Sequence, residues 1–247
     1  MRYIDINSIE NLDELQLRLK ECKDWGCVRS ILADLSKKTC WYCEHYVPAT
    51  GYAEVDHWRP KSQKMYPWLE FEIKNYIYSC KCCNNKKLDK FPLKDDTKRA
   101  KSPTDDISKE EPLLLNPLNK SDIQSICYDM SGRLVPKKNE IRDKVRKTKE
   151  ILQLDTTDRL AEKSKAFSVL CSDLDTYLQF KSNEEFANVM IKKINEKIKY
   201  EEGNPFVWSF CMYIESWFKE NDTKLVGTNI REKIKFPEDF KEVYLNN

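Results

Sequence analysis

The stretch "CWYCEHYVPATGYAEVDHW", residues 40–58, contains both histidines of a chain of 247 residues. It opens with a Cys-x-x-Cys pair, Cys40 and Cys43, and a second pair, Cys80 and Cys83, follows after 36 intervening residues. Each pair offers two thiolates to one tetrahedral ion, and four thiolates complete a closed structural zinc site. The sequence therefore predicts a zinc ion that staples a small module and contributes to its folding energy.

The other cysteines and the first histidine have simpler interpretations. We treat Cys82 as a bystander, because a Cys80–Cys82 pair would be too tight for one ion. We interpret His45 as a surface residue or as a neighbour of the ligands. Buried free thiols or a redox pair remain alternatives to the zinc site. The scattered cysteines, interpreted as small apolar fillers, are Cys22, Cys27, Cys127, Cys171 and Cys211.

Composition indicates a soluble globular protein in the cytoplasm. Hydrophobic residues make up 40% of the chain and charged residues 34%. No apolar run approaches the roughly 18 residues that span a bilayer, so we expect no membrane partner. Asp5 lies where a signal peptide would have its apolar region. In a reducing compartment, clustered cysteines favour metal binding over disulfides.

Charge is unevenly distributed around the cysteines, although the formal net charge is only +2. Residues 59–101 contain twelve Lys or Arg against five Asp or Glu, whereas residues 102–122 contain five acids and two lysines. A basic island of this kind fits a polyanionic substrate such as nucleic acid. A solvated surface explains the same charges equally well.

The hydrophobic pattern predicts an α+β chain that is mostly helical. Within the part that holds the cysteines, the short β-prone runs at 52–58 and 75–80 predict two strands. A helix is expected from Cys83 or Asn84 to just before Pro92. The predicted regions are a helical segment at 1–39, the zinc-stapled module at 40–100, an irregular connector at 101–136 and a helical lobe at 137–247.

Helix boundaries in the outer regions follow from local signals. Asn11 with Glu14, and Ser182 with Glu185, resemble capping boxes. Gly203 is expected to end a helix, and the segment "PFVWSFCMYIESWF" at 205–218 then begins with a proline in its first turn. This segment is apolar nearly all round, so we expect it to be buried in the lobe or against a partner.

The residues between and beside the cysteine pairs suggest hydrolytic chemistry. Asp56 offers a carboxylate oxygen and Asn84 an amide oxygen, which are hard ligands suited to magnesium. His57 can act as a general base near neutral pH. A base beside a divalent cation is what phosphodiester hydrolysis requires, whereas a zinc ion with four thiolates has no open position for water.

The ordered motifs resemble a known family. Cys-x-x-Cys, Val-Asp-His-x-x-Pro, an asparagine on the second strand and Cys-x-x-Cys-Asn-x-x-Lys look like the zinc-bound HNH (ββα-metal) nucleases. The longer motifs "CWYCE", "VDHWRPKS", "NYIYSCKCCNNKKLDKFP" and "EPLLLNP" resemble the PtuB family, the HNH component of Septu antiphage systems. The resemblance covers 40–117 and is only general in the helical remainder.

The resemblance implies a role for each motif residue. His57 would be the general base, and Asp56 and Asn84 would hold a catalytic Mg²⁺ or Mn²⁺. Asn75 would fix the loop that presents His57. Many HNH enzymes have histidine where Asn84 stands, so this position departs from the usual pattern. The residues implied to contact substrate phosphates are Lys87, Arg59 and Lys61.

The resemblance also implies partners. PtuB proteins are paired with the ATPase PtuA, and some occur with retrons, so a reverse transcriptase and its RNA and DNA are further candidates. The substrate could be DNA or RNA, including tRNA, because HNH chemistry needs no 2′-hydroxyl. The alternative function is a non-catalytic zinc-ribbon module that binds nucleic acid or protein. Such a module would have no use for Asp56, His57 and Asn84 together.

Overall fold

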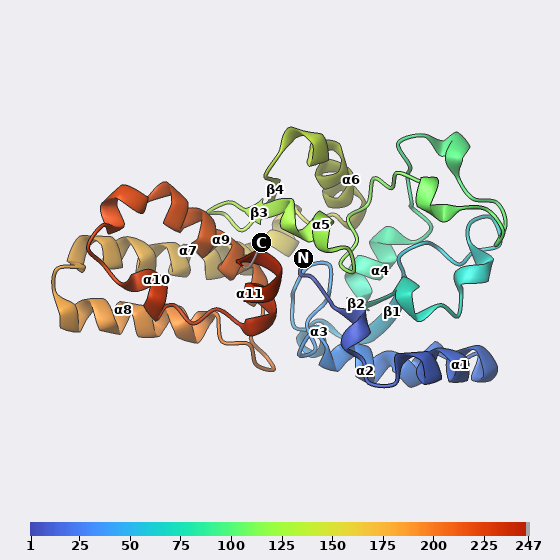
Figure 1. The fold of residues 1–247 in the computed structure, drawn as a ribbon, viewed down its shortest axis with the longest axis horizontal. Coiled ribbons are helices and arrows are strands. Elements are labelled where there is room, and N and C mark those ends of the chain that lie inside the picture. The colour runs from blue at the N-terminus through green and yellow to red at the C-terminus, as the bar shows by residue number, and fades with distance from the viewer. Residues whose placement is uncertain (246–247) are drawn as a thin grey trace.

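The computed structural model describes residues 1–245 and confirms a mostly helical α+β chain. The described part contains two sheets, each of two antiparallel strands. In Figure 1 the long helices of the C-terminal lobe lie on the left, and the strands β1 and β2 lie on the right, close to the N-terminal helices. None of the helices within 1–245 is long and apolar enough to cross a membrane.

The N-terminal region is helical, as predicted. Its capping differs from the prediction, because Asn11 adopts a left-handed conformation with φ 55° and its side chain caps nothing. A second helix of this region ends at Asp34, and turns lead from there to Cys40. The elements are η1 (Ile6–Ser8), α1 (Leu12–Cys22), η2 (Trp25–Val28), α2 (Arg29–Asp34) and α3 (Val47–Thr50).

Both predicted strands of the middle region are present, and a helix follows the second. β1 and β2 pair antiparallel, with Ala53 opposite Cys80 and His57 opposite Tyr76. The helix begins at Lys81, slightly earlier than predicted, because the Cys80 sulfur accepts a hydrogen bond from the Cys83 amide and caps it. The elements are β1 (Ala53–His57), η3 (Pro67–Leu69), η4 (Ile73–Asn75), β2 (Tyr76–Cys80) and α4 (Lys81–Lys87).

The region predicted as an irregular connector contains regular structure. Strands β3 and β4 form a hairpin whose turn uses Gly132 at φ 74° and the Asp129 carboxylate, which accepts from the amides of Ser131 and Arg133. Prolines suggested only a connector, but Pro136 ends an edge strand, where proline is tolerated. The elements are η5 (Asp96–Lys98), η6 (Ile107–Lys109), α5 (Lys120–Gln124), β3 (Ile126–Tyr128) and β4 (Leu134–Pro136).

The C-terminal lobe is helical, with different boundaries from those predicted. Asn183, not Ser182, caps α8 by accepting from the Phe186 amide. That helix ends before Gly203, and Pro205 precedes the next helix instead of lying in its first turn. The elements are η7 (Asn139–Ile141), α6 (Arg142–Leu152), α7 (Thr157–Phe180), α8 (Glu184–Lys197), α9 (Val207–Glu220), η8 (Asp222–Leu225), α10 (Ile230–Lys233) and α11 (Glu238–Tyr244).

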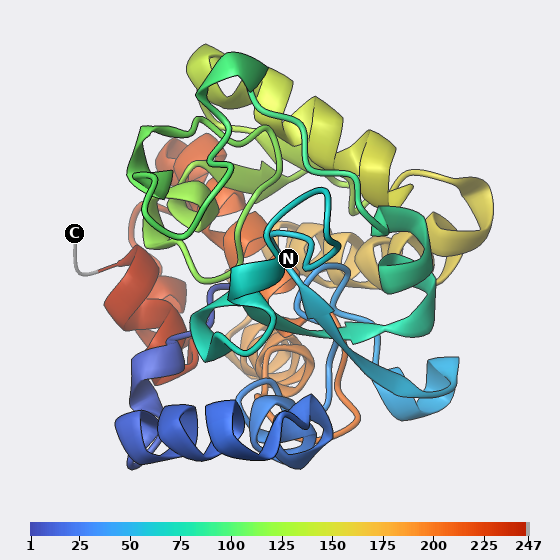
Figure 2. The same cartoon turned by 90° about the vertical axis from the view of Figure 1, so that its right-hand side faces the viewer.

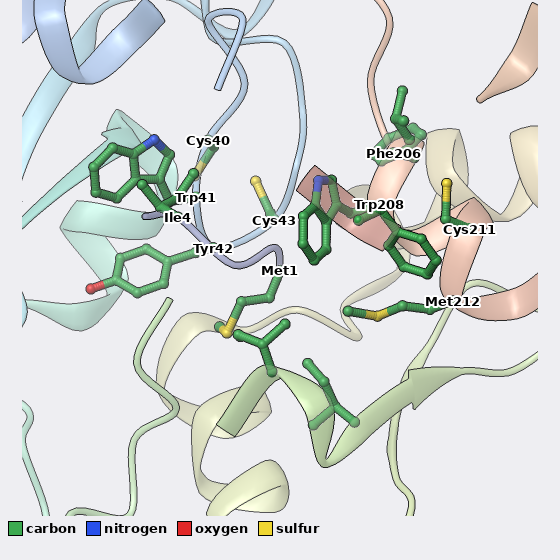
Figure 3. Close-up of a cluster of buried hydrophobic side chains, with 14 of the residues drawn as sticks. Met1, Ile4, Cys40, Trp41, Tyr42, Cys43, Phe206, Trp208, Cys211 and Met212 are labelled. Atoms are coloured by element: carbon green, nitrogen blue, oxygen red, sulfur yellow. The ribbon is translucent and has the colours of Figure 1, made fainter. Parts of the chain in front are cut away.

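The hydrophobic core runs without a break from the first cysteine pair into the C-terminal lobe. Figure 3 shows Met1, Trp41 and Tyr42 on one side and Trp208 and Met212, from α9, on the other. Figure 2 shows the same relation from the side, with β1 and β2 in front of the lobe. The apolar segment at 205–218 is therefore buried mainly within the chain itself.

A buried carboxylate strengthens this junction. Glu44, next to Cys43, accepts hydrogen bonds from the amide and hydroxyl of Ser209 on α9, at 3.1 and 2.5 Å. The amino group of Met1 lies 2.6 Å from the same carboxylate, and the ammonium of Lys163 on α7 lies 3.9 Å from it. Although burial acts to raise it, these two cations hold the pKa of Glu44 at about 2. The first cysteine pair is thus attached to both α7 and α9.

Candidate active site

The four predicted cysteines come together in one buried cluster. The sulfur atoms of Cys40, Cys43, Cys80 and Cys83 lie within 4.8 Å of one another, and those of Cys43 and Cys80 are 3.8 Å apart. Zn–S bonds of about 2.3 Å would place the sulfurs of a tetrahedral site about 3.8 Å apart. The donor set and spacing therefore fit a zinc ion. Cys82 lies exposed on α4, outside the cluster.

Two side chains with cationic or aromatic character lie beside this cluster, one from the lobe and one from the cysteine turn. A guanidinium nitrogen of Arg159, on α7, lies 2.9 Å from the Cys83 sulfur, where it offsets the negative charge of a thiolate. The imidazole of His45 packs edge-on against Phe206 at 4.9 Å and lies 3.6 Å from the Glu162 carboxylate. His45 therefore lies between the cysteine turn and the lobe and does not project freely into solvent.

A pocket of about 350 Å³ follows the edge of β1 that has no partner strand within the described residues. Its walls include four residues that the sequence singled out: Asp56, His57, Lys61 and Asn84. Asp56 and His57 are successive residues of a strand, so their side chains leave opposite faces. The pocket still reaches both residues, because it wraps around the exposed edge of the strand.

His57 has a defined tautomer in this pocket. Its Nε2 lies 2.8 Å from the carbonyl oxygen of Glu70, which can only accept, so Nε2 carries the proton and Nδ1 does not. The ring packs edge-on against Tyr76 at 5.0 Å and Trp25 at 5.8 Å. Burial lowers the pKa of His57 to about 4, so the imidazole is neutral at pH 7. A neutral imidazole with a free Nδ1 can accept a proton.

Asp56 is held by two hydrogen bonds within the chain. Its Oδ2 accepts from the Tyr42 hydroxyl at 2.7 Å, and its Oδ1 accepts from the Lys87 ammonium at 3.2 Å. Burial raises the pKa of Asp56, while the charge of Lys87 acts in the opposite direction. Both carboxylate oxygens retain further lone pairs, so a cation in the pocket would compete with Lys87 for this group.

The resemblance implies that Lys87 contacts a substrate phosphate, but its side chain is buried in this structure. It is 0% exposed, and its ammonium also donates to the His57 carbonyl oxygen at 2.6 Å. Its position one helical turn beyond Asn84 directs it toward β1 rather than toward solvent. A phosphate contact by Lys87 would require this buried ion pair to open. The geometry therefore assigns Lys87 to the junction of α4 with β1.

Asn84 lies beside an acidic residue that the sequence analysis missed. Its Nδ2 donates to the Glu54 carboxylate at 2.6 Å, which leaves the amide oxygen available. Glu54 lies two residues before Asp56, so both carboxylates leave the same face of β1. The strand period could have identified Glu54, since the second residue before a candidate ligand shares its face. The pocket lining thus includes three carboxylates, those of Glu54, Asp56 and Asp89, and one amide.

Asn75 fixes the backbone that follows His57. Its Oδ1 accepts from the Arg59 amide at 2.8 Å, and its Nδ2 donates to the Arg59 carbonyl at 2.9 Å. The Trp58 amide donates to the Asn75 carbonyl oxygen at 2.8 Å. These bonds hold residues 58–59 against the start of β2.

The two other cations implied to bind substrate are both paired. The guanidinium of Arg59 lies 2.9 Å from the fully buried carboxylate of Glu110 and above the ring of Trp58. Lys61 pairs with Glu70 at 2.7 Å, and its ammonium lies 3.6 Å from the centre of the Trp25 ring. Arg59 is therefore a structural cation in this conformation, whereas Lys61 is a third exposed and lines the pocket.

The N-terminal region contributes residues that the motif alone could not reveal. Trp25, from η2, forms one wall of the pocket, and Arg29, from the start of α2, lines its mouth. Arg29 is exposed, and within residues 1–245 its guanidinium forms no hydrogen bond or ion pair. Cys22 and Cys27, predicted to be apolar fillers, are also exposed beside this wall. No local sequence signal connects these residues with His57.

The chain is similar to a Septu protein over part of its length. It is 32% identical over 117 residues to the Septu protein PtuB of Bacillus mycoides (strain KBAB4). The match covers 42% of this chain and 39% of that relative, so the similarity concerns less than half of each protein. No model of a known protein family matches the chain.

Proposed function

We propose that this chain is a metal-dependent nuclease of the HNH type that hydrolyses phosphodiester bonds in nucleic acid and serves a Septu-like antiphage system. The observation that carries the proposal is the neutral imidazole of His57, with Nδ1 unprotonated, in the same pocket as Asp56 and Asn84. The similarity to a Septu protein PtuB supports the defence role. An assay with plasmid DNA and tRNA distinguishes the two substrates, DNA and RNA.

His57 would act as the general base. Its Nδ1 accepts a proton from the attacking water, and the Glu70 carbonyl oxygen stabilises the positive charge that then develops on the imidazole. The rings of Trp25 and Tyr76 pack edge-on against the imidazole and keep it in place. Asn75 keeps the following backbone fixed, which limits how far the base can move from the bond to be cut.

The donors in the pocket fit a hard divalent cation, Mg²⁺ or Mn²⁺. The oxygen atoms of Asp56, Glu54 and Asn84 would hold it, and it would stabilise the charge on the departing oxygen. Before a cation binds, the ammonium of Lys87, 3.2 Å from the Asp56 carboxylate, favours the charged form of this group and holds it in position. The cysteine cluster would hold zinc in a structural role, because four thiolates leave no position open for water.

One observation favours the alternative of a non-catalytic zinc-stapled binding module. Both oxygens of Asp56 already accept hydrogen bonds from the chain, and the Asn84 amide already contacts Glu54. These contacts give each side chain a structural role that requires no cation. A binding module would not depend on the protonation state of His57, so the two functions differ in their response to its replacement.

A cleavage assay separates the two functions. The purified full-length chain is incubated with supercoiled plasmid DNA or with tRNA in Mg²⁺ or Mn²⁺, with and without a co-purified PtuA-like ATPase. We expect cleavage of one of these substrates, loss of cleavage in EDTA and its recovery on adding Mg²⁺. Binding without cleavage under every condition would contradict the nuclease and support the binding module.

Arg29 is expected to contact a phosphate of the substrate. Replacing it with Gln should weaken nucleic-acid binding by about tenfold and lower the slope of log K against log salt by about one. Arg231→Gln removes the same charge from α10, where the guanidinium pairs with Asp222, and serves as the matched control. Binding isotherms of labelled DNA and tRNA over a range of salt measure both effects. Equal slopes for the two variants would contradict the contact.

The partner ATPase is expected to dock at the far end of the α7–α8 hairpin, on the left in Figure 1. Phe180 and Phe186 are 48% and 39% exposed there, and their rings lie 5.0 Å apart. Exposed aromatic residues are typical of protein interfaces. We expect the interface here and not at the segment 205–218, because that segment is already buried within the chain. An ATPase bound at this end of the lobe would leave the pocket open to substrate.

Co-expression with a PtuA-like ATPase followed by size-exclusion chromatography tests this location. Phe180→Ser with Phe186→Ser should abolish co-elution, because both anchors are lost while the helices remain intact. Leu17→Ser, at a residue of α1 that is 65% exposed, is the control and should co-elute as the wild type does. Co-elution of the double variant would place the interface elsewhere, and absence of any complex would remove this partner.

A further inference from the structure

Two exposed thiols lie next to each other at the surface, outside the cysteine cluster. The sulfur of Cys22, the last residue of α1, is 4.0 Å from the sulfur of Cys27 in η2. The Cys27 thiol donates to the carbonyl oxygen of Asp24 at 2.8 Å. Both residues are open to solvent, whereas the four clustered cysteines are buried. A small reagent would therefore reach this pair without entering the core.

The short segment between these thiols carries a wall of the candidate active site. Trp25 lies edge-on to His57, with ring centres 5.8 Å apart and an interplanar angle of 87°. The same ring lies under the ammonium of Lys61 at 3.6 Å and packs against Phe71 at 6.2 Å. A displacement of η2 would move the indole ring of Trp25 and thereby change the surroundings of both His57 and Lys61.

We propose that Cys22 and Cys27 form a reversible disulfide, and that its formation displaces Trp25 and lowers the activity of the His57 site. The part that concerns activity rests on the proposed nuclease function, whereas disulfide formation does not depend on it. Redox-sensing cysteines of this type are known in reducing compartments, where their disulfides are transient. The site is thus a modification site that takes a small-molecule disulfide as its reagent.

The reaction is a thiol–disulfide exchange in two steps. The Cys22 thiolate attacks one sulfur of the small-molecule disulfide, a mixed disulfide forms, and the first small thiolate leaves. The Cys27 thiolate then attacks the Cys22 sulfur, and the second small thiolate leaves. The two protons from the protein thiols end on the two released thiols. The protein pair loses two electrons, and the small-molecule disulfide gains them.

Closing the pair draws the two sulfurs together across the turn that carries Trp25. A disulfide bond is about 2.05 Å long, so the sulfurs must approach by about 2 Å from their separation of 4.0 Å. The Cys27 thiol loses its hydrogen bond to the Asp24 carbonyl in the process. Asp24 also caps η2 by accepting from the Gly26 amide at 2.8 Å, so the loss of the thiol hydrogen bond alters the turn that positions Trp25.

The test uses the full-length zinc-loaded protein with oxidised and reduced glutathione at a series of ratios. Peptide mapping after alkylation should show a Cys22–Cys27 disulfide, with an unchanged zinc content. Cleavage should fall about ten- to a hundredfold in the oxidised protein and recover with dithiothreitol, because a misplacement of about 1 Å costs about a hundredfold. Cys22→Ser and Cys27→Ser should form no such bond and should keep full cleavage in the oxidant.

Tryptophan fluorescence reports on the disulfide independently of nuclease activity. Oxidation should change the fluorescence contribution of Trp25, taken as the difference between the wild type and a Trp25→Phe variant. Cys22 and Cys27 recovered as free thiols at all ratios would overturn the proposal, as would a disulfide that leaves Trp25 unchanged. A protein that forms the disulfide and shifts Trp25 but cleaves nothing in its reduced state would instead refute the nuclease.

Discussion

Replacing Cys80 with Ser is expected to remove the bound zinc and unfold the region that contains β1, β2 and α4. Cys80 belongs to the sulfur cluster, pairs with Ala53 across the strands and caps α4 through its sulfur. Structural zinc binding contributes about 10–16 kcal/mol in small peptides, comparable to the whole stability of about 5–15 kcal/mol of a domain. The loss should spread into the lobe, because the core is continuous and Arg159 contacts Cys83.

Elemental analysis and thermal unfolding measure this effect. The wild-type chain should carry about one zinc ion, and Cys80→Ser should carry none and lose its cooperative transition. Cys82→Ser is a matched control on the same helix, since this exposed thiol lies outside the cluster. It should keep both the zinc and the transition. Wild-type protein free of zinc, or a Cys80→Ser chain that retains it, would rule out the structural site.

The parts of the site that the sequence predicted are those defined by local patterns. The two Cys-x-x-Cys pairs predicted the cluster because each pair fixes two ligands within one turn. The strands around Asp56 and Tyr78 followed from short β-prone runs next to turn residues. Pairing of these strands brings the two cysteine pairs together, so the predicted strands and the predicted cysteine cluster are consistent with each other.

The burial and pairing of the motif cations could not be predicted, because they depend on contacts between distant segments. Lys87 looked like a substrate contact because its charge follows the motif, but its partner Asp56 lies 31 residues away and the pair is buried. Arg59 is likewise occupied by Glu110, 51 residues further along the chain. A basic residue in a motif predicts a cation near the site. Whether that cation faces the substrate depends on carboxylates that the motif does not include.

Helix ends were also hard to predict, because a cap depends on backbone conformation as well as on residue type. Asn11 has the side chain of a good N-cap but adopts a left-handed conformation, in which its side chain makes no capping bond. Asn183 caps α8 one residue beyond Ser182, and the sequence offers both. The hairpin β3–β4 was not predicted, because strands of only three residues are too short to show an alternating pattern.

Replacing His57 with Gln is expected to reduce cleavage by about 10²–10⁴-fold, the usual contribution of a general base, while fold and zinc content stay intact. The glutamine amide can still donate to the Glu70 carbonyl oxygen, 2.8 Å from Nε2 in the wild type, so the buried acceptor keeps its partner. No group remains that can take the proton at the position of Nδ1. Single-turnover cleavage at saturating enzyme isolates this step from binding.

His45→Gln is the matched control, because it removes the other histidine of the chain from a site between the cysteine turn and Phe206. It should lower thermal stability slightly and leave the single-turnover rate unchanged. Binding of nucleic acid by the His57 variant should equal that of the wild type, since the base contributes no charge at neutral pH. A His57→Gln chain that cleaves at the wild-type rate, with zinc and fold confirmed, would show that another group removes the proton and that the HNH assignment is wrong.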